Sequence, residues 1–430
     1  MVSIGMTGQE EECPYETYKI TGKLYISGEI REASLLIKEG KIALLGKSLP
    51  DMSAPTLELG RYEVALPGMV DLHVHMRGLK LSHKEDWYSG TLSALKGGVT
   101  FVADMPNTVP PTVTISALEE KLEEAKLNAL VDYGVYFGVP GKLDIYLRAL
   151  NKGIIGLKIY PKDYRSPILM KLIKINSERG LITVLHAEDP EVEDKNRLAE
   201  VSAVKYFSKI SINHGVRIHF THISSSETVN LMLISKLKGA KVTFDITPHH
   251  AFLNEKLRER LGGIAIVRPP LRDEESRVAI YNSLRNLIAD AYATDHAPHT
   301  LEEKISEKPP PGFPGLEVSL GLLTTEVLER KASWRIIDLY SSRPAELLNI
   351  PKGKLLPGFD ADIVVLDTKR RWKVKGESFL SKAKYTPFEG WELRGIISKV
   401  FIRGVKAYEE GEIFVKRGFG KMYGGHFGEN

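Results

Sequence analysis

The sequence predicts an α/β protein, a (β/α)8 TIM barrel with a small β-sandwich domain built from both chain ends. Three observations predict this fold class. The middle of the chain alternates short apolar runs with longer amphipathic segments, as repeated βα units do. Eight apolar runs are present, and a middle of about 280 residues suits one barrel. Both ends are instead rich in short segments that alternate apolar and polar residues.

The two chain ends are expected to meet in one domain. Segments such as 23–26 and 34–37 are separated by glycine and charged residues, a pattern typical of an antiparallel sheet, and the same texture returns after residue 356. We therefore expect residues 1–67 and 356–430 to form the two parts of the small β domain. The catalytic barrel would occupy residues 68–355.

The barrel strands are expected to end at eight positions along the middle of the chain. These positions are near Arg77, Pro106, Val139, Tyr160, Ala187, Ile223, Thr247 and Asp295. Helices are expected between them, for example over 115–130 and 167–179. Gly153, Gly180 and Gly239 stand near the returns from helix to strand, where glycine commonly ends a helix.

Composition and charge restrict the class of protein. Hydrophobic residues make up 43% and charged residues 27% of the 430 residues, which is typical of a soluble globular protein. No apolar run approaches the ~20 residues needed to cross a bilayer. The 59 basic and 55 acidic residues are spread along the chain without a basic block. We therefore expect binding to neither membrane nor nucleic acid.

Cysteine usage and the start of the chain predict a cytoplasmic location. The single cysteine, Cys13, excludes an internal disulfide framework and agrees with a reducing compartment. Residues 1–18 are polar and acidic, so they lack the basic and apolar regions of a secretory signal.

His73 and His75 are the most informative residues of the chain. They end an apolar strand, and positions two apart on a strand share a face. Imidazole is a common zinc ligand, so the pair suits a shared metal ion. A pair of hydrogen-bonded core histidines is the alternative reading of this motif alone.

The other expected strand ends favour the metal site. Active sites of barrel enzymes form at the carboxyl ends of the strands. The polar residues at these ends are Arg77, Asn107, Lys158, His186, His222, Asp295, His296 and His299. Ionisable groups are rarely buried without partners, so core packing explains this set poorly.

Lys158 determines what kind of metal site is expected. A protonated ammonium beside two divalent ions would be repelled by several kcal/mol at an effective dielectric of about 20. The site is consistent if Lys158 is neutralised and carboxylated by carbon dioxide, because the resulting carbamate has two oxygens that bridge two metals. A lysine that binds an anionic substrate or forms a Schiff base is the alternative.

Several stretches of the chain resemble the dihydroorotases of the amidohydrolase superfamily. These stretches are 67–108, 156–160, 247–250 and 295–304. Two further stretches, 309–317 and 385–390, resemble most closely the dihydroorotase domain of the animal multifunctional pyrimidine-synthesis protein. The resemblance covers nearly the whole barrel, and it implies a barrel of the metal-dependent hydrolase type.

The resemblance implies a binuclear zinc centre with two Zn2+ per subunit, bridged by N6-carboxylated Lys158. Its ligands would be His73, His75 and Asp295 for the first ion, His186 and His222 for the second, and Lys158 for both. A water bridging two such ions is acidified enough to supply hydroxide near neutral pH. Asp71 and Glu188 are candidates for orienting the ligands.

The resemblance also implies contacts to substrate. The residues are Arg77, Asn107, Arg268, His299, Pro314 and Gly315. The first two, with help from His299, would bind the exocyclic carboxylate of dihydroorotate, because a guanidinium forms two parallel hydrogen bonds to a carboxylate. Arg268 and the backbone at Pro314 and Gly315 would meet the ring amide edges. Residues 161–166 stand where relatives place a mobile loop, and their polar content fits a lid.

One departure from the family pattern is visible. Relatives commonly continue Arg-Glu-Pro-Gly after H-x-H, whereas this chain has Arg77-Gly78-Leu79-Lys80. The spacing to Lys84 and Glu85 is kept. We therefore expect a different loop conformation beside unchanged ligand positions.

The activity that the resemblance implies is that of a dihydroorotase, a hydrolase acting on a cyclic amide C–N bond. It would reversibly cyclise N-carbamoyl-L-aspartate to (S)-dihydroorotate and water in the third step of de novo pyrimidine (UMP) biosynthesis. Asp295 would be the catalytic residue that moves the proton between the attacking water and the amide nitrogen.

Two alternatives stay open. An allantoinase or hydantoinase would share the fold and the ligands, but Arg77, Asn107 and His299 suit an anionic substituent. A non-catalytic barrel homologue would usually lose ligands, whereas all six positions are filled here. The expected partner is a small-molecule substrate. The sequence leaves open a homodimer and an association with aspartate transcarbamoylase.

Overall fold

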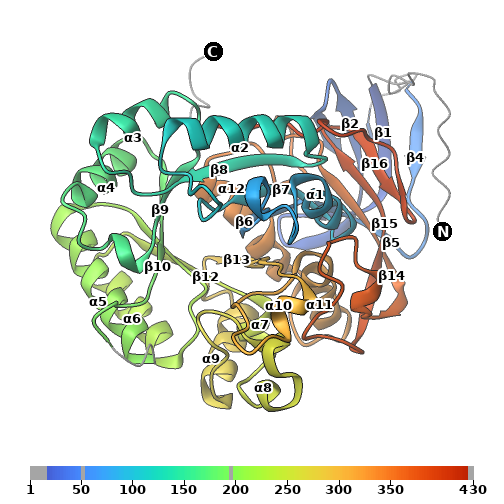
Figure 1. Ribbon diagram of the computed structural model, residues 1–430. Helices are drawn as coiled ribbons and strands as arrows, with labels where there is room; N and C mark the ends of the chain where they lie inside the picture. The colour runs from blue at the N-terminus through green and yellow to red at the C-terminus, as the bar shows by residue number, and fades with distance from the viewer. Residues whose placement is uncertain (1–16, 50–53, 193–196, 425–430) are drawn as a thin grey trace.

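The structure, a computed structural model, describes residues 17–49, 54–192 and 197–424. It contains a parallel β-barrel surrounded by helices and a second sheet beside it, at the right of Figure 1. Cys13 lies outside the described residues. Within the described ranges, no helix combines the length and the apolar character that crossing a bilayer requires.

The predicted (β/α)8 barrel is confirmed. Its eight parallel strands follow one another around the barrel in chain order. They are β6 (Met69–Val74), β7 (Val99–Asp104), β8 (Asp132–Phe137), β9 (Gly156–Ile159), β10 (Ile182–His186), β11 (Ile218–Thr221), β12 (Val242–Ile246) and β13 (Ala291–Tyr292). The ring closes at the end of β6 and beyond the end of β13, where Val74 pairs with His296 and the His75 N–H donates to the His296 carbonyl at 2.8 Å.

Helices cover the outside of the barrel. Those that follow the first six strands are α1 (Trp87–Lys96), α2 (Ile115–Asn128), α3 (Leu143–Leu150), α4 (Leu169–Glu178), α5 (Arg197–His214) and α6 (Ser226–Leu237). Side-chain caps start several of them. Thr114 accepts a hydrogen bond from the Ala117 N–H at the start of α2, and Ser225 does the same for Thr228 at α6. Leu118 and Ala125 of α2 are fully buried against the barrel.

The last two barrel strands are followed by longer, broken connections. They contain α7 (Pro248–Phe252), α8 (Lys256–Leu261), α9 (Glu274–Arg285), α10 (Leu301–Lys304), α11 (Leu316–Leu328) and α12 (Ser342–Leu348). Short 3-10 turns are η1 (Leu79–Leu81), η2 (Pro161–Asp163), η3 (Gly262–Ala265), η4 (Trp334–Tyr340) and η5 (Gly376–Ser378). Several of these segments lie at the carboxyl end of the barrel, where they surround the site described below.

The second sheet joins both ends of the chain, as the sequence predicted. Its strands are β1 (Thr17–Ile26), β2 (Glu29–Lys38), β3 (Lys41–Gly46), β4 (Thr56–Glu58), β5 (Glu63–Pro67), β14 (Ile363–Lys373), β15 (Glu392–Ile402), β16 (Val405–Glu409) and β17 (Glu412–Ile413). β5 pairs with β1 in parallel and with β14 in antiparallel fashion, so the nine strands form one continuous sheet. Ile20, Leu35 and Ile363 are fully buried in the core that this sheet encloses.

The sheet and the barrel share a buried ion cluster. Nζ of Lys352 lies 2.7 Å from Asp132 at the start of β8, and 2.9 and 2.8 Å from Asp360 and Asp362 before β14. All four side chains are buried. Burial disfavours the charge of Lys352, but the carboxylates outweigh burial and raise the pKa of Lys352. The cluster therefore fixes the sheet to the amino-terminal end of the barrel strands.

Candidate active site

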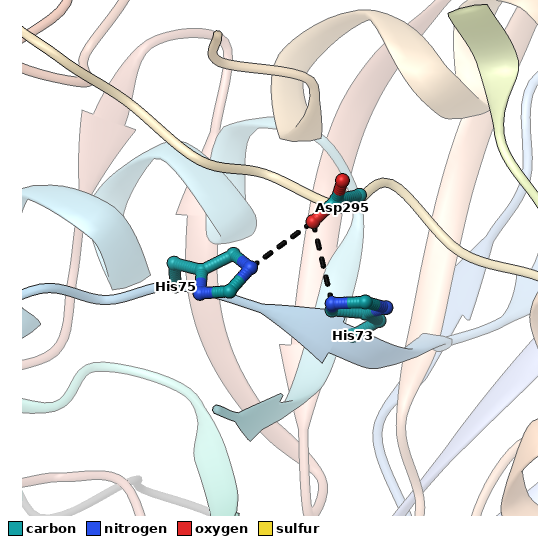
Figure 2. A group of neighbouring side chains, drawn as sticks. All are labelled: His73, His75 and Asp295. Atoms are coloured by element: carbon teal, nitrogen blue, oxygen red, sulfur yellow. Dashed lines mark hydrogen bonds and ion pairs between the residues drawn. The ribbon is translucent and has the colours of Figure 1, made fainter. Parts of the chain in front are cut away.

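Three side chains converge where the barrel closes. Nε2 of His73 lies 3.3 Å and Nε2 of His75 3.1 Å from Oδ1 of Asp295, and Figure 2 shows both rings turned toward that carboxylate. All three residues are buried. Their ligand atoms lie within 4.8 Å of one another. Two imidazoles and a carboxylate at this spacing fit one divalent cation.

Asn107, just after β7, orients the His75 ring. Oδ1 of Asn107 lies 2.6 Å from Nδ1 of His75. An amide oxygen only accepts hydrogen bonds, so Nδ1 carries the proton and Nε2 keeps its lone pair toward Asp295. His75 is therefore held in the tautomer that binds a metal through Nε2.

The second group of predicted ligands lies on the neighbouring strands of the same barrel end. Lys158 belongs to β9, His186 ends β10, and His222 follows β11. The ring centroids of His186 and His222 are 4.6 Å apart, and those of His73 and His222 are 5.2 Å apart. The structure thus brings all six predicted ligand residues to one end of the barrel.

An unpaired buried nitrogen atom marks this group as fit for metal. Nδ1 of His222 is buried and has no hydrogen-bond partner among the described residues. Burying a polar atom without a partner is unfavourable, so such atoms are rare unless a ligand satisfies them. His186 donates through Nε2 to Glu188 at 2.9 Å, which leaves its Nδ1 lone pair for an ion.

The electrostatics of the site favour neutral histidines. Burial lowers the pKa of His73, His75, His186 and His222, and the nearby Lys158 charge adds to the effect at each. Neutral imidazole is the metal-binding form.

Lys158 is fully buried, and Nζ donates to Oγ1 of Thr221 at 3.2 Å. No carboxylate of the described residues is within ion-pair distance of this ammonium. Burial lowers the pKa of Lys158, while Asp295 and Asp245 oppose that effect from farther away. Burial likewise raises the pKa of Asp295. A lysine in this environment readily gives up its proton.

Asp71 ties the two strands that carry the first ligand group. Its carboxylate accepts hydrogen bonds from the His73 N–H at 3.1 Å, the Thr294 N–H at 3.2 Å and the Tyr340 hydroxyl at 2.9 Å. Asp71 therefore orients His73 and Asp295 through their main chains and does not touch the imidazole. Glu188, the other predicted orienting residue, contacts the His186 ring directly.

Three site residues have a backbone conformation that non-glycine residues rarely adopt. The φ angles of Arg77, His222 and Asp295 are 57°, 44° and 49°. Such residues cost of order 1–3 kcal/mol each and cluster at functional sites. At His222 a hydrogen bond offsets part of this cost, because Oδ1 of Asp245 accepts the His222 N–H at 2.7 Å. The chain thereby turns at each strand end, where the site residues gather.

The loop after His75 contains Arg77-Gly78-Leu79-Lys80, where the sequence departs from the family pattern. Arg77, Gly78 and Leu79 have positive φ in succession. Gly78 has φ of 63° and ψ of −171°, a combination that only glycine adopts readily, so this position needs glycine. Glu124 of α2 accepts the Leu79 N–H at 2.8 Å. The loop is thus fixed against α2.

A cavity of about 690 Å³ opens above the six ligand residues. It is lined by those six and also by Arg77, Asn107, Tyr160, Pro161, Lys162, Asp163, Glu188, Arg268, His299, Pro311 and Gly312, among others. Its size suits a small cyclic molecule. The predicted lid segment contributes three residues to the lining, 161–163.

The predicted substrate residues differ in their burial and in whether they line the cavity. Arg77 is buried, and its Nη2 lies 3.1 Å from Nε2 of His299. Arg268 is exposed at the cavity, with Nε donating to Glu188 at 2.9 Å. Pro314 and Gly315 are absent from the described cavity lining, and the Gly315 N–H donates to Nδ1 of His296 at 3.2 Å. Pro311 and Gly312 of the same segment line the cavity in their place.

Two residues without a predicted role also shape the cavity. The Tyr160 hydroxyl is buried without a partner among the described residues. Nζ of Lys304 donates to the carbonyls of Ile266, Pro310 and Gly312 at 2.9, 2.8 and 2.8 Å, which joins the two segments of one cavity wall. In the sequence Lys304 follows two other charged residues, Glu302 and Glu303, so the local composition does not predict that it is buried.

Fold and site together define an amidohydrolase. The amidohydrolase family model matches residues 64–407, which is more than half of the chain, so the chain belongs to this family. Members carry a metal centre, and the group of His73, His75 and Asp295 fits one.

Comparison with known proteins shows which amidohydrolases this chain resembles. The dihydroorotase of Pyrococcus abyssi is 33% identical over 407 residues, which cover 92% of this chain and 96% of that protein. The multifunctional protein CAD of Squalus acanthias is 36% identical over 367 residues, 83% of this chain and 15% of that protein. The L-hydantoinase (dihydropyrimidinase) from Arthrobacter aurescens has a TM-score of 0.90 at 28% identity and covers 95% of this chain and 100% of its own. Within the family, the curated relatives place the chain among the dihydroorotases.

Proposed function

We propose that the protein catalyses the reversible cyclisation of N-carbamoyl-L-aspartate to (S)-dihydroorotate, the dihydroorotase reaction. One observation carries the choice of substrate. The buried Arg77 guanidinium and the His299 ring meet at 3.1 Å beside the cavity that also holds His73, His75 and Asp295. An anion-binding pair next to a hydrolytic centre suits a cyclic amide with a carboxylate substituent. The dihydroorotase relatives support the same choice.

The residues proposed to hold two zinc ions are His73, His75 and Asp295 for one, His186 and His222 for the other, and carboxylated Lys158 for both. The unpaired Nδ1 of His222, the lone pairs left on His75 and His186, and Nε2 of His73, which faces Asp295, support this set. When bound, zinc polarises a carbonyl oxygen and acidifies a water molecule near neutral pH.

Carboxylation of Lys158 follows from its environment. Burial lowers the pKa of the ammonium, so the neutral amine is populated near neutral pH. The amine nitrogen forms a bond to the carbon of carbon dioxide and releases a proton, which yields a carbamate. This reaction replaces a buried positive charge by a negative one that suits two cations.

Asp295 is the proposed proton carrier. In the hydrolytic direction its carboxylate takes a proton from the attacking water and delivers it to the amide nitrogen as the C–N bond breaks. In the biosynthetic direction the same group removes the proton from that nitrogen. Burial raises the pKa of Asp295, which favours a carboxyl group that exchanges protons.

The substrate would be oriented by four side chains. Arg77 and Asn107 bind the exocyclic carboxylate with help from His299, and Arg268 meets the ring amide. The backbone at Pro314 and Gly315, in the same segment as the cavity-lining Pro311 and Gly312, meets the other amide edge.

Comparing turnover tests the substrate. The purified protein is assayed with zinc on dihydroorotate, allantoin and hydantoin, and we expect the highest kcat/KM on dihydroorotate. Preference for either neutral ring would instead favour an allantoinase or hydantoinase, whose fold this chain shares. A chain that binds no divalent ions and stays inactive after zinc is added would be a non-catalytic homologue.

We also propose the division into a barrel over residues 68–355 and a β domain over 1–67 and 356–430, and an association with aspartate transcarbamoylase. The match to part of a multifunctional protein supports a partner enzyme. Sedimentation of the chain alone and mixed with aspartate transcarbamoylase tests both this association and a homodimer.

A further inference from the structure

The His299 ring is surrounded by more hydrogen-bonding groups than one tautomer can use. Nζ of Lys84 lies 3.0 Å and Oε2 of Glu303 3.3 Å from Nδ1. On the other side of the ring, Nη2 of Arg77 and the carbonyl of Pro311 each lie 3.1 Å from Nε2. Each nitrogen thus faces one donor and one acceptor.

These contacts form two exclusive sets. Burial, Arg77 and Lys84 lower the pKa of His299 to about 3, so the ring is neutral and carries one N–H. With the proton on Nδ1, the ring donates to Glu303 and accepts from Arg77. With the proton on Nε2, it accepts from Lys84 and donates to Pro311. Lysine and arginine only donate, so no mixture of the two sets is consistent.

The two sets present different chemistry to the cavity. In the Nδ1–H set, the Nε2 lone pair accepts an N–H of Nη2 of Arg77, so that N–H is not available to an anion. In the Nε2–H set, the ring donates to the Pro311 carbonyl and no longer accepts from Arg77. Nη2 of Arg77, which also lines the cavity, then keeps an N–H for an acceptor such as a carboxylate oxygen.

We infer that Lys84 selects the Nε2–H tautomer of His299 and so makes the cavity specific for cyclic amides with an anionic substituent. This inference rests on the proposed function. Lys84 is a positioning residue, because it acts on substrate through the His299 ring. Its ammonium is itself held by Glu303, with Nζ 2.9 Å from Oε1, and its side chain is only 14% exposed.

Kinetics on a matched pair of substrates test this role. Dihydrouracil is dihydroorotate without the carboxylate, so the ratio of kcat/KM for the two measures the contribution of the anionic group. We expect Lys84→Met to raise KM for dihydroorotate about tenfold to a hundredfold with little change in kcat, since a hydrogen bond to a charged group is lost. Turnover of dihydrouracil should stay unchanged, and Lys84→Arg should recover much of the loss.

Lys80→Met is the matched control. Lys80 lies four residues earlier in the same loop, is exposed, and is not among the groups around His299. Its removal takes away one positive charge from the same loop without touching the ring. We expect its kinetic constants to remain within about twofold of wild type, because exposed charges interact weakly. A KM increase equal to that of Lys84→Met would overturn the inference in favour of general charge attraction.

Nitrogen NMR of the His299 ring in the free protein provides a readout that does not depend on turnover. The resonance is assigned by its loss in His299→Gln. We expect the Nε2–H population to fall in the order Glu303→Gln, wild type, Lys84→Met. An unchanged tautomer in Lys84→Met overturns the inference. Absence of wild-type turnover on dihydroorotate would count against the proposed function alone.

Discussion

Oδ1 of Asn107 lies 2.6 Å from Nδ1 of His75, on a different ring nitrogen from the one that faces Asp295. Asn107, three residues past the end of β7, thus determines which ring nitrogen His75 offers to a metal. The sequence suggested only a substrate contact for Asn107. Its hydrogen bond to a ligand gives it a second role, and the two roles make different predictions.

Asn107→Ala should lower the affinity of the first metal site about tenfold to a hundredfold, the usual effect of removing a partner of a metal-bound histidine. Asn107→Asp keeps an acceptor for Nδ1 and should keep the metal, although its charge would repel the substrate carboxylate. Zinc content after dialysis against graded chelator measures the affinity. Equal retention in wild type and Asn107→Ala would show that Asn107 serves substrate alone.

Asp295→Ala should lower kcat by about two to four orders of magnitude, the contribution of a general acid–base group. Much of the metal should remain bound, because the histidines and Lys158 are unchanged. Elemental analysis of the same sample separates loss of metal from loss of proton transfer. Asp144→Ala, which removes an exposed carboxylate from the first turn of α3, is the control. Near-normal turnover in Asp295→Ala would refute the proton-carrier role.

Removing the metals should abolish turnover, and returning zinc together with bicarbonate should restore it. Lys158→Met should not recover under the same treatment. With carbon-13 bicarbonate, the wild-type protein should show a carbamate resonance that Lys158→Met lacks. Full activity alongside an unmodified Lys158 amine would contradict the binuclear site.

Lys352→Met should destabilise the fold by about 3–5 kcal/mol, because it removes the cation that three buried carboxylates share and leaves only Lys41 at Asp360 and Arg403 at Asp132. Lys354→Met is the matched control: Lys354 lies two residues away, pairs with the exposed Glu346 at 2.7 Å, and should contribute about 1 kcal/mol or less. Urea unfolding measures both. Similar losses in the two variants would show that the buried cluster is not stabilising.

The Lys352 cluster also predicts a pH dependence. Burial opposes the charge of Asp360, but Lys352 and Lys41 outweigh burial and hold its pKa below the ordinary value. In wild type this contribution to stability is present above the unfolded pKa of about 4 and is lost as the pH falls through the folded pKa. In Lys352→Met, Asp360 keeps only Lys41 as a cationic partner, so its pKa rises. The destabilisation should therefore shrink as the pH is lowered from about 8 to about 5.

The barrel was predictable because its strands are apolar runs at regular intervals. Each expected end falls slightly beyond the observed one: β9 ends at Ile159 where Tyr160 was expected, and β6 ends at Val74 where Arg77 was expected. Apolar character continues past the last hydrogen-bonded pair. The turns at Arg77 and Asp295, with φ of 57° and 49°, end the strands earlier, and no propensity of arginine or aspartate predicts them.

The ligand positions were predictable for the same reason, since polar residues at the ends of parallel strands gather at one end of a barrel. The surroundings of His299 were not. Lys84 and Pro311 come from separate connections and meet the ring only after the barrel closes. The position of Gly315 was not predictable either: it precedes α11, and its N–H donates to Nδ1 of His296.

The shape of the small domain also depended on long-range pairing. Alternating segments at both ends predicted its strands, but not that β5 would pair with β1 and β14 at once. That double pairing merges the two groups of strands into one sheet.

The antiparallel pairing of Pro67 with Ile363 has a consequence for biosynthesis of the chain. β5 leads directly into the first barrel strand, yet its neighbour β14 leaves the ribosome nearly 300 residues later. Nascent chains therefore expose an apolar strand edge for most of translation, a period in which aggregation competes with maturation. Such distant contacts form slowly, so assembly of the whole molecule waits for its final segment.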